Sequence, residues 1–95
     1  MRQKATDAEV QAALAKLPGW ELEDGAIMRS FEFADFKQAW AFMGRVAEAA
    51  EALDHHPEWT NVYNKVLIRL STHDADGLTR LDFELAAKID AFVAS

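Results

Sequence analysis

The sequence predicts an α+β domain in which a four-stranded antiparallel sheet carries three helices packed on one face. Three observations lead to this prediction. Three segments repeat apolar residues at helical spacing, four short segments alternate apolar and polar residues, and an Asp-Gly pair joins the first two of those short segments. The predicted order is α-β-β-α-β-β-α. With 95 residues and no linker or repeat, positions 1–95 are expected to form one domain.

The first helix is expected to begin at a capping box. In Thr6-Asp7-Ala8-Glu9 the hydroxyl and the glutamate carboxylate can each accept a hydrogen bond from a free amide of the first turn. Pro18-Gly19 ends the element. The helical spacing that supports it is carried by Val10, Leu14 and Leu17.

A hairpin follows this helix. Trp20–Glu23 alternates as a strand does, Asp24-Gly25 is a strong hairpin signal, and 26–33 supplies the partner strand. Arg29 interrupts the otherwise apolar face of that strand, which predicts a bulge or an edge position there.

The second helix is the longest element and is expected to run from the N-cap Asp35 to about Asp54. It should stop before Pro57, because a proline disfavours helical geometry at the residue before it. An apolar stripe at helical spacing is expected to face the core: Phe36, Trp40, Met43, Ala47, Ala50 and Leu53.

Two more strands and a helix complete the chain. The strands are expected at 60–64 and 66–71, with a turn at Asn64-Lys65 between them. A loop at 75–77 precedes a last helix that begins at Thr79, with Asp82 in its first turn. Its buried stripe is expected to be Leu81, Leu85, Ile89, Phe92 and Val93.

Charge and composition exclude several classes of protein. The net charge is −6, which argues against direct binding of nucleic acid or of an anionic membrane surface. There are no cysteines, so a disulfide framework and thiolate chemistry are excluded. No apolar run approaches membrane-spanning length and the first residues do not resemble a signal peptide, so a cytoplasmic location is expected.

All three histidines occur in two short segments. His55 and His56 lie in Asp54-His55-His56-Pro57-Glu58-Trp59, and His73 lies in Ser71-Thr72-His73-Asp74. Adjacent side chains such as His55 and His56 usually diverge and no His-x-x-x-His pair occurs, so a metal site is not expected. Histidine exchanges protons near neutral pH, and a helix end can meet a strand end at the rim of a sheet. The pattern therefore favours general acid–base catalysis by two histidines on one small molecule.

The chain resembles the pterin-4a-carbinolamine dehydratase family. The resemblance runs from Pro18-Gly19-Trp20 to the final helix. It is carried by 51–59 (Glu-Ala-Leu-Asp-His-His-Pro-Glu-Trp), 61–66 (Asn-Val-Tyr-Asn-Lys-Val), 71–74 (Ser-Thr-His-Asp), 77–79 (Gly-Leu-Thr) and Asp82.

This resemblance implies a dehydration of 4a-hydroxytetrahydropterin to quinonoid dihydropterin and water, which supports recycling of a pterin cofactor by a hydro-lyase. An acid protonates the 4a-hydroxyl and a base removes the N5 proton, so no metal or other cofactor of the protein is implied. His55 and His73 become the leading acid–base candidates, and His56 the third histidine of the site. Which of them is acid and which is base stays open.

The resemblance also implies residues that contact the substrate. The segments that match the family's pterin contacts contribute Asp54, Ser71, Thr72 and Asp74. Three further residues are candidates for contact with the substrate, although each has an alternative structural role. Glu51 can be a solvated helix residue, Trp20 a buried strand residue and Asp82 a carboxylate at the start of a helix.

A non-enzymatic interaction module is the alternative function. Some relatives act as dimerisation cofactors of a transcription factor, so a protein partner on the long helix is possible by resemblance. An outward patch of Phe42, Arg45 and Ala49 is the surface expected for it. A homodimer or homotetramer is also expected, through pairing of sheet edges.

Overall fold

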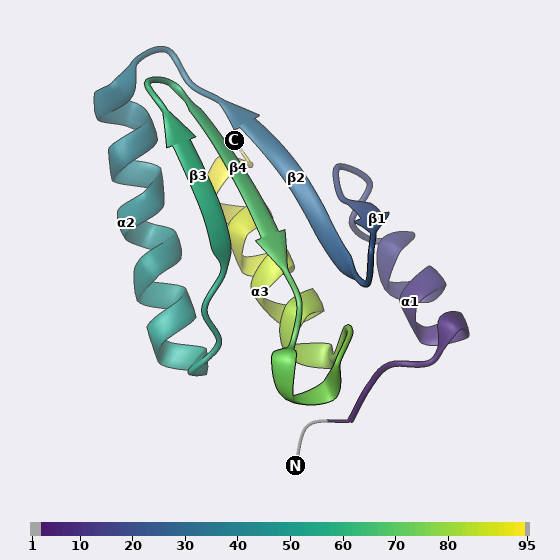
Figure 1. Ribbon diagram of the computed structural model, residues 1–95. Coiled ribbons are helices and arrows are strands. Elements are labelled where there is room, and N and C mark those ends of the chain that lie inside the picture. The colour runs from purple at the N-terminus through teal and green to yellow at the C-terminus, as the bar shows by residue number, and fades with distance from the viewer. Residues whose placement is uncertain (1–2, 95) are drawn as a thin grey trace.

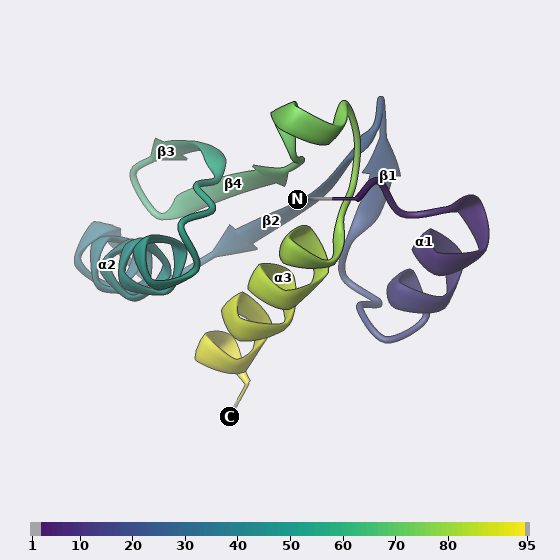
Figure 2. The same ribbon diagram turned by 90° about the horizontal axis from the view of Figure 1, so that it is seen from below.

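The computed structural model describes residues 3–94 and has the predicted order of elements. Four strands form one antiparallel sheet in the order β1-β2-β4-β3 (Figure 1). Figure 2 shows α2 and α3 side by side on one face of this sheet, with α1 beyond β1. The elements are α1 (Asp7–Leu14), β1 (Glu21–Glu23), β2 (Ala26–Glu32), α2 (Phe36–Leu53), β3 (Glu58–Val62), β4 (Lys65–Leu70), a 3₁₀ turn (His73–Ala75) and α3 (Arg80–Val93).

The predicted helix caps and the first hairpin turn form as the sequence predicts, but two other signals do not. The first helix ends at Leu14, before Pro18-Gly19, and the turn between β3 and β4 lies at Tyr63-Asn64, one residue before the predicted Asn64-Lys65. Thr6 and Thr79 each begin a helix with a complete capping box, and Asp35 caps α2 by accepting from the Gln38 amide. The β1–β2 turn has both Asp24 and Gly25 at positive φ, at 48° and 74°. Two consecutive left-handed residues match the right-handed twist of the flanking strands, which is why Asp-Gly closes this hairpin.

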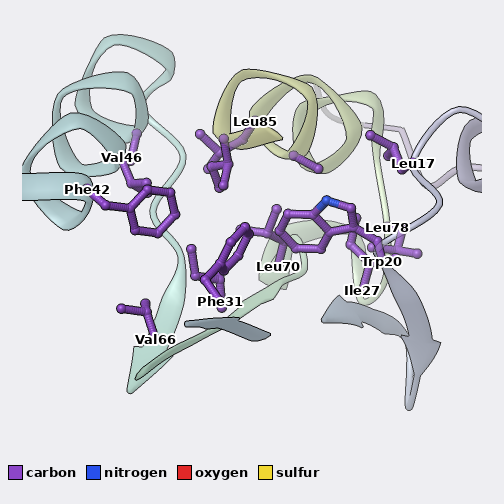
Figure 3. Packing of buried hydrophobic residues seen from close by; sticks show 14 of the residues in the cluster. Leu17, Trp20, Ile27, Phe31, Phe42, Val46, Val66, Leu70, Leu78 and Leu85 are labelled. Atoms are coloured by element: carbon purple, nitrogen blue, oxygen red, sulfur yellow. The ribbon is translucent and has the colours of Figure 1, made fainter. Parts of the chain in front are cut away.

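The core lies between the sheet and the two long helices (Figure 3). Phe42 and Val46 of α2 meet Phe31 and Val66 of the sheet, and Leu85 of α3 lies beside them on the same face of the sheet. The phenyl rings of Phe31 and Phe33 both contact that of Phe42, at 4.9 Å between ring centres. In α3, Leu85 and Ile89 are buried as predicted, while Leu81, Phe92 and Val93 are partly buried.

The structure corrects the predicted core stripe of α2. Phe36 and Trp40 are 45% and 64% exposed, and Ala47 is exposed as well, whereas Met43 and Leu53 are only partly buried. The buried residues of this helix are Ala39, Phe42, Val46 and Ala50. The outward patch predicted around Phe42 is therefore wrong: the Phe42 ring is 5% exposed, and the Arg45 guanidinium lies over the ring of Phe92, 4.5 Å from its centre.

The bulge expected at Arg29 is absent. The register between β2 and β4 is unbroken from Ile27 to Glu32, and Arg29 lies opposite Ile68 on the helix-covered face. Its guanidinium reaches Asp90 of α3 at 2.6 Å, which provides a partner for the charge. β2 is an interior strand, although β1 pairs only with its first three residues, Ala26–Met28.

The chain segment before α1 is held against the loop after β4. The Ala5 amide donates to the Leu78 carbonyl at 2.7 Å. The Lys4 side chain lies over Gly77, where a Cβ atom would stand 2.8 Å from Lys4 Cε. Gly77 also has φ of +158° and pairs with Thr72 in an isolated bridge, so this loop is fixed at both of its ends.

Candidate active site

Two segments far apart in the sequence meet at one end of the sheet. The end of α2 and the turn after β4 lie at the same end, the lower one in Figure 1. Together they line a hollow of about 180 Å³. We call this the histidine hollow, and its lining residues are Asp54, His55, His56, Ser71, Thr72, His73 and Asp74. All seven were predicted as site residues from the sequence.

The end of α2 is shaped so that His55 turns inward. Asp54 adopts the left-handed conformation, with φ of 51°, and ends the helix. The amide of His55 donates to the carbonyl of Ala50 at 3.0 Å, an acceptor that it shares with the amide of Asp54, and this bond closes the last turn of the helix. The His55 side chain is consequently only 4% exposed.

His55 is bound to a fully buried carboxylate. Its Nε2 atom lies 2.5 Å from Oδ1 of Asp82, and the Asp82 side chain is 0% exposed. The hydroxyl of Thr72 and the backbone amide of Thr79 both donate to the other oxygen, Oδ2, at 2.8 and 2.9 Å. Because Thr72 donates its proton to Asp82, the Thr79 hydroxyl donates to Thr72 Oγ1, at 2.8 Å.

This network gives His55 a defined orientation. Asp82 accepts three hydrogen bonds, which suits an ionised carboxylate because that group only accepts. The His55 Nε2–H therefore donates to Asp82, and Nδ1 is the nitrogen left for another partner. Asp82 does not line the histidine hollow itself. It influences this hollow only by orienting the ring of His55.

The other two histidines have different surroundings. His56 Nε2 lies 2.7 Å from Oε1 of Glu51, and this pair is on the surface, with side-chain exposures of 58% and 81%. His73 is exposed and begins the 3₁₀ turn that follows β4. One histidine is thus fixed in the interior, while two are open to solvent.

A second hollow adjoins the first at His56. It lies between α2 and the start of β3, and we call it the α2–β3 hollow. It holds about 750 Å³, is open on its outer side, and is lined by Ala47, Glu48, Ala50, Glu51, Ala52, His56, Pro57 and Trp59. The histidine hollow alone is smaller than the roughly 300–1,000 Å³ typical of ligand pockets. The α2–β3 hollow, which shares His56 with it, adds to the space available beside the histidines.

Trp20 is the predicted site residue that the structure does not bring to this place. Its ring is buried among core residues, and its Nε1 donates to Asp90 Oδ1 at 2.8 Å. Asp90 lies two turns of α3 beyond Asp82. Trp20 therefore connects the first hairpin to α3 and does not line either hollow.

Some members of the site carry no clear signal in the sequence. Thr79 was recognised as a helix start, but its hydrogen bond to Thr72 joins two segments that the sequence does not relate. Pro57 was recognised as the residue that stops the long helix, and neither Pro57 nor Trp59 was predicted to line a hollow. In residues 3–94, no three His, Asp or Glu side chains are grouped to hold a metal ion, and no helix combines the length and apolar character needed to cross a membrane.

Comparison with known proteins identifies the family of this fold and site. Residues 3–92 match the family model described as pterin 4 alpha carbinolamine dehydratase. The chain belongs to this family.

Relatives match along nearly their full length. Two that carry the name "putative pterin-4-alpha-carbinolamine dehydratase" are from Novosphingobium aromaticivorans and Solibacter usitatus. The first is 59% identical over 95% of this chain and 96% of the relative. The second is 49% identical over 99% of both chains.

A solved structure has the same fold. The crystal structure described as a transcriptional coactivator/pterin dehydratase from Brucella melitensis is 46% identical, with a TM-score of 0.94. The match covers 97% of this chain and 100% of that chain.

Proposed function

We propose that this chain catalyses the dehydration of a 4a-hydroxytetrahydropterin to quinonoid dihydropterin and water by histidine general acid–base catalysis. The single observation that supports it best is the convergence of His55, His56 and His73 on one hollow from two separate segments. Membership of the dehydratase family supplies the substrate class. An interaction module would not require three imidazoles around one hollow.

The reaction needs two proton transfers. The proton on N5 leaves to a base, the C4a–O bond breaks as an acid protonates the hydroxyl, and a C4a=N5 double bond forms with release of water. Hydroxide is a poor leaving group, so a positioned acid lowers the barrier. His55 and His73 carry these protons in our proposal, and His56 with its partner Glu51 holds the ring or assists the transfer.

Asp82 serves as a positioning residue for His55. Its hydrogen bond orients the imidazole with Nδ1 available to the substrate. The remaining predicted contacts, Asp54, Ser71, Thr72 and Asp74, line the hollow and contribute the polar groups that surround the pterin edge.

Turnover is the direct test. Stopped-flow decay of freshly generated 4a-hydroxytetrahydropterin should be accelerated by the wild-type protein. The double substitution H55A/H73A should lower that rate by about 10²-fold or more, since each positioned transfer contributes about 10²–10⁴-fold. Circular dichroism of the variant confirms that the fold is kept. A wild-type protein that leaves the decay unchanged would refute the proposal.

The second candidate function is helix-mediated binding to a transcription regulator. The exposed side of α2, with Phe36 and Trp40, is the observation that favours it, and the Brucella melitensis protein is described as a coactivator as well as a dehydratase. A pulldown with helical segments of transcription factors, read beside the turnover assay, separates the two functions.

A further inference from the structure

The two leading proton carriers of the site are held in different ways. The ring of His55 is fixed from inside by its bond to the buried carboxylate of Asp82. The ring of His73 is exposed, and within residues 3–94 its side chain forms no hydrogen bond or ion pair. The direction of this ring therefore depends on the backbone that carries it. We call residues 72–77 the His73 loop.

The His73 loop is closed at its base by backbone hydrogen bonds. The amide of Thr72 donates to the carbonyl of Gly77 at 2.8 Å, and the amide of Gly77 donates to the carbonyl of Thr72 at 3.3 Å. These two residues are buried, whereas the tip of the loop is largely exposed. A segment with few buried contacts opens locally at little cost in free energy. The base of the loop therefore decides how firmly His73 is held.

The chain before α1 lies beside this base, as Figure 1 shows. We call Lys4 and Ala5 the strap. The Ala5 amide donates to the carbonyl of Leu78, the residue directly after the loop, at 2.7 Å. The stem of Lys4 covers Gly77, since a Cβ atom added there would lie 2.8, 3.4 and 3.5 Å from Cε, Cδ and Cγ of the lysine. A lysine stem can cover a buried surface in this way while its ammonium group stays in water.

We infer that the strap positions His73. By holding Gly77 and Leu78 it keeps the pair of Thr72 and Gly77 closed, and His73, which follows Thr72 directly, keeps its place in the lining of the histidine hollow. Neither strap residue lines this hollow, so the strap acts through the loop and not on a bound molecule. The consequence for the reaction rests on the proposed function, whereas the effect of the strap on the loop does not.

Amide hydrogen exchange tests the hold of the strap on the loop. A5P removes the amide hydrogen that binds Leu78, and exchange at Thr72 should become about tenfold faster relative to exchange at the buried Ile68 of β4. T6A is the matched control, because Thr6 is the next residue and its side chain caps α1. On the same relative scale T6A should leave exchange at Thr72 within about twofold of the wild type. Unchanged exchange at Thr72 in A5P would overturn the inference.

Lys4 provides a second probe that leaves the backbone of the strap intact. K4A removes the stem over Gly77, whereas K4M keeps a stem that reaches equally far and removes only the charge. K4A should speed exchange at Thr72 about threefold, and K4M should match the wild type, because the stem and not the ammonium group covers the loop. Equal exchange rates in K4A and K4M would contradict this role of the stem.

Turnover measures the consequence for the reaction. A5P should lower kcat about tenfold and leave KM within about twofold, because a proton carrier displaced by about 1 Å can lose about 10²-fold in rate while the substrate keeps its other contacts. T6A should keep the kcat of the wild type. In an H73A background, A5P should lower kcat by less than about twofold, since the ring through which the strap acts is gone. A tenfold loss in that background would show that the strap acts elsewhere.

The ring signals of the histidines in NMR spectra separate the inference from the proposed function. The chain has three histidines, so single alanine variants assign each signal. A5P and K4A should move the signal of His73 toward that of histidine in an unstructured peptide and leave the signal of His55 in place. If these changes occur in a protein that shows no turnover, the proposed function fails and the positioning of His73 is supported. A His73 signal that stays unmoved in both variants would refute the positioning even where turnover is confirmed.

Discussion

At the scale of single residues, the buried pair of His55 and Asp82 places the strictest requirement on its surroundings, because each polar group in it needs a partner. Both side chains are buried, and an unpaired buried charge would cost several kcal/mol. Every oxygen of Asp82 has a partner: His55 on one side, and Thr72 and the Thr79 amide on the other. The same carboxylate therefore stabilises the start of α3 and orients a histidine of the site.

D82N separates these two effects by keeping the shape of the side chain and removing its charge. The amide nitrogen would face the backbone N–H of Thr79, so one buried donor loses its acceptor, and the free energy of unfolding should fall by about 1–3 kcal/mol. Turnover should fall about tenfold or more, a loss of about 1.4 kcal/mol of transition-state stabilisation, because the ring of His55 loses the carboxylate that fixes its orientation.

Urea denaturation and stopped-flow turnover measure the two effects on D82N. D76N is the matched control, because Asp76 is exposed and its left-handed conformation suits asparagine. Unchanged turnover in folded D82N would rule out the positioning role.

The sequence predicts the histidines of the site better than it predicts their partners. Three histidines in two segments that end elements can be recognised without a structure, because elements of an antiparallel sheet end at common rims. The bond between His55 and Asp82 spans 27 residues and has no spacing rule. The position of Asp82 after Thr79 predicts that it caps the start of α3. It does not predict that Asp82 also binds His55.

At the scale of elements, α2 shows where periodicity stops being informative. Two rows of this helix are apolar, one with Phe36 and Trp40 and the other with Phe42 and Val46. Hydrophobic spacing reveals both rows but does not indicate which of them faces the core. In the structure the row of Phe42 is buried, and its ring packs against Phe31 and Phe33.

The two capping boxes provide a comparison of the same motif in two environments. T6A should lower the free energy of unfolding by about 1 kcal/mol, the usual effect of losing an exposed N-cap. T79A should lower it by about 2–3 kcal/mol, since this hydroxyl is buried and also donates to Thr72. Chemical denaturation of both variants measures the difference, and equal losses would mean that the Thr72–Thr79 bond contributes nothing.

At the scale of the whole molecule, Asp90 joins the first hairpin to the last helix. One of its oxygens accepts from both Trp20 and Arg29, and the guanidinium also lies over the Phe31 ring, 4.5 Å from its centre. Arg29 looks like an irregularity in the strand pattern, yet it is a regular strand residue with a partner that follows it by 61 positions. Sequence patterns within one element cannot reveal that partner.

D90A should therefore destabilise the fold without altering the site. The buried Trp20 N–H loses its acceptor, and the free energy of unfolding should fall by about 2–3 kcal/mol. Turnover should stay within about twofold of the wild type at a temperature where the variant is folded, because the site is distant and independent. E84A, on an exposed position of α3, is the control. A large loss of turnover in folded D90A would show that this end of α3 is coupled to the histidines.

The continuous α2 helix also constrains how the length of this chain can change. Its 18 residues run unbroken from the Asp35 cap to Asp54, and each residue advances the helix by about 100°. Deleting one residue in its middle would swing everything downstream by that angle, taking Ala50 out of the interior and His55 away from Asp82 together. Insertions and deletions that survive selection are therefore expected in the connecting loops, where the chain can gain or lose residues without rotating His55 away from Asp82.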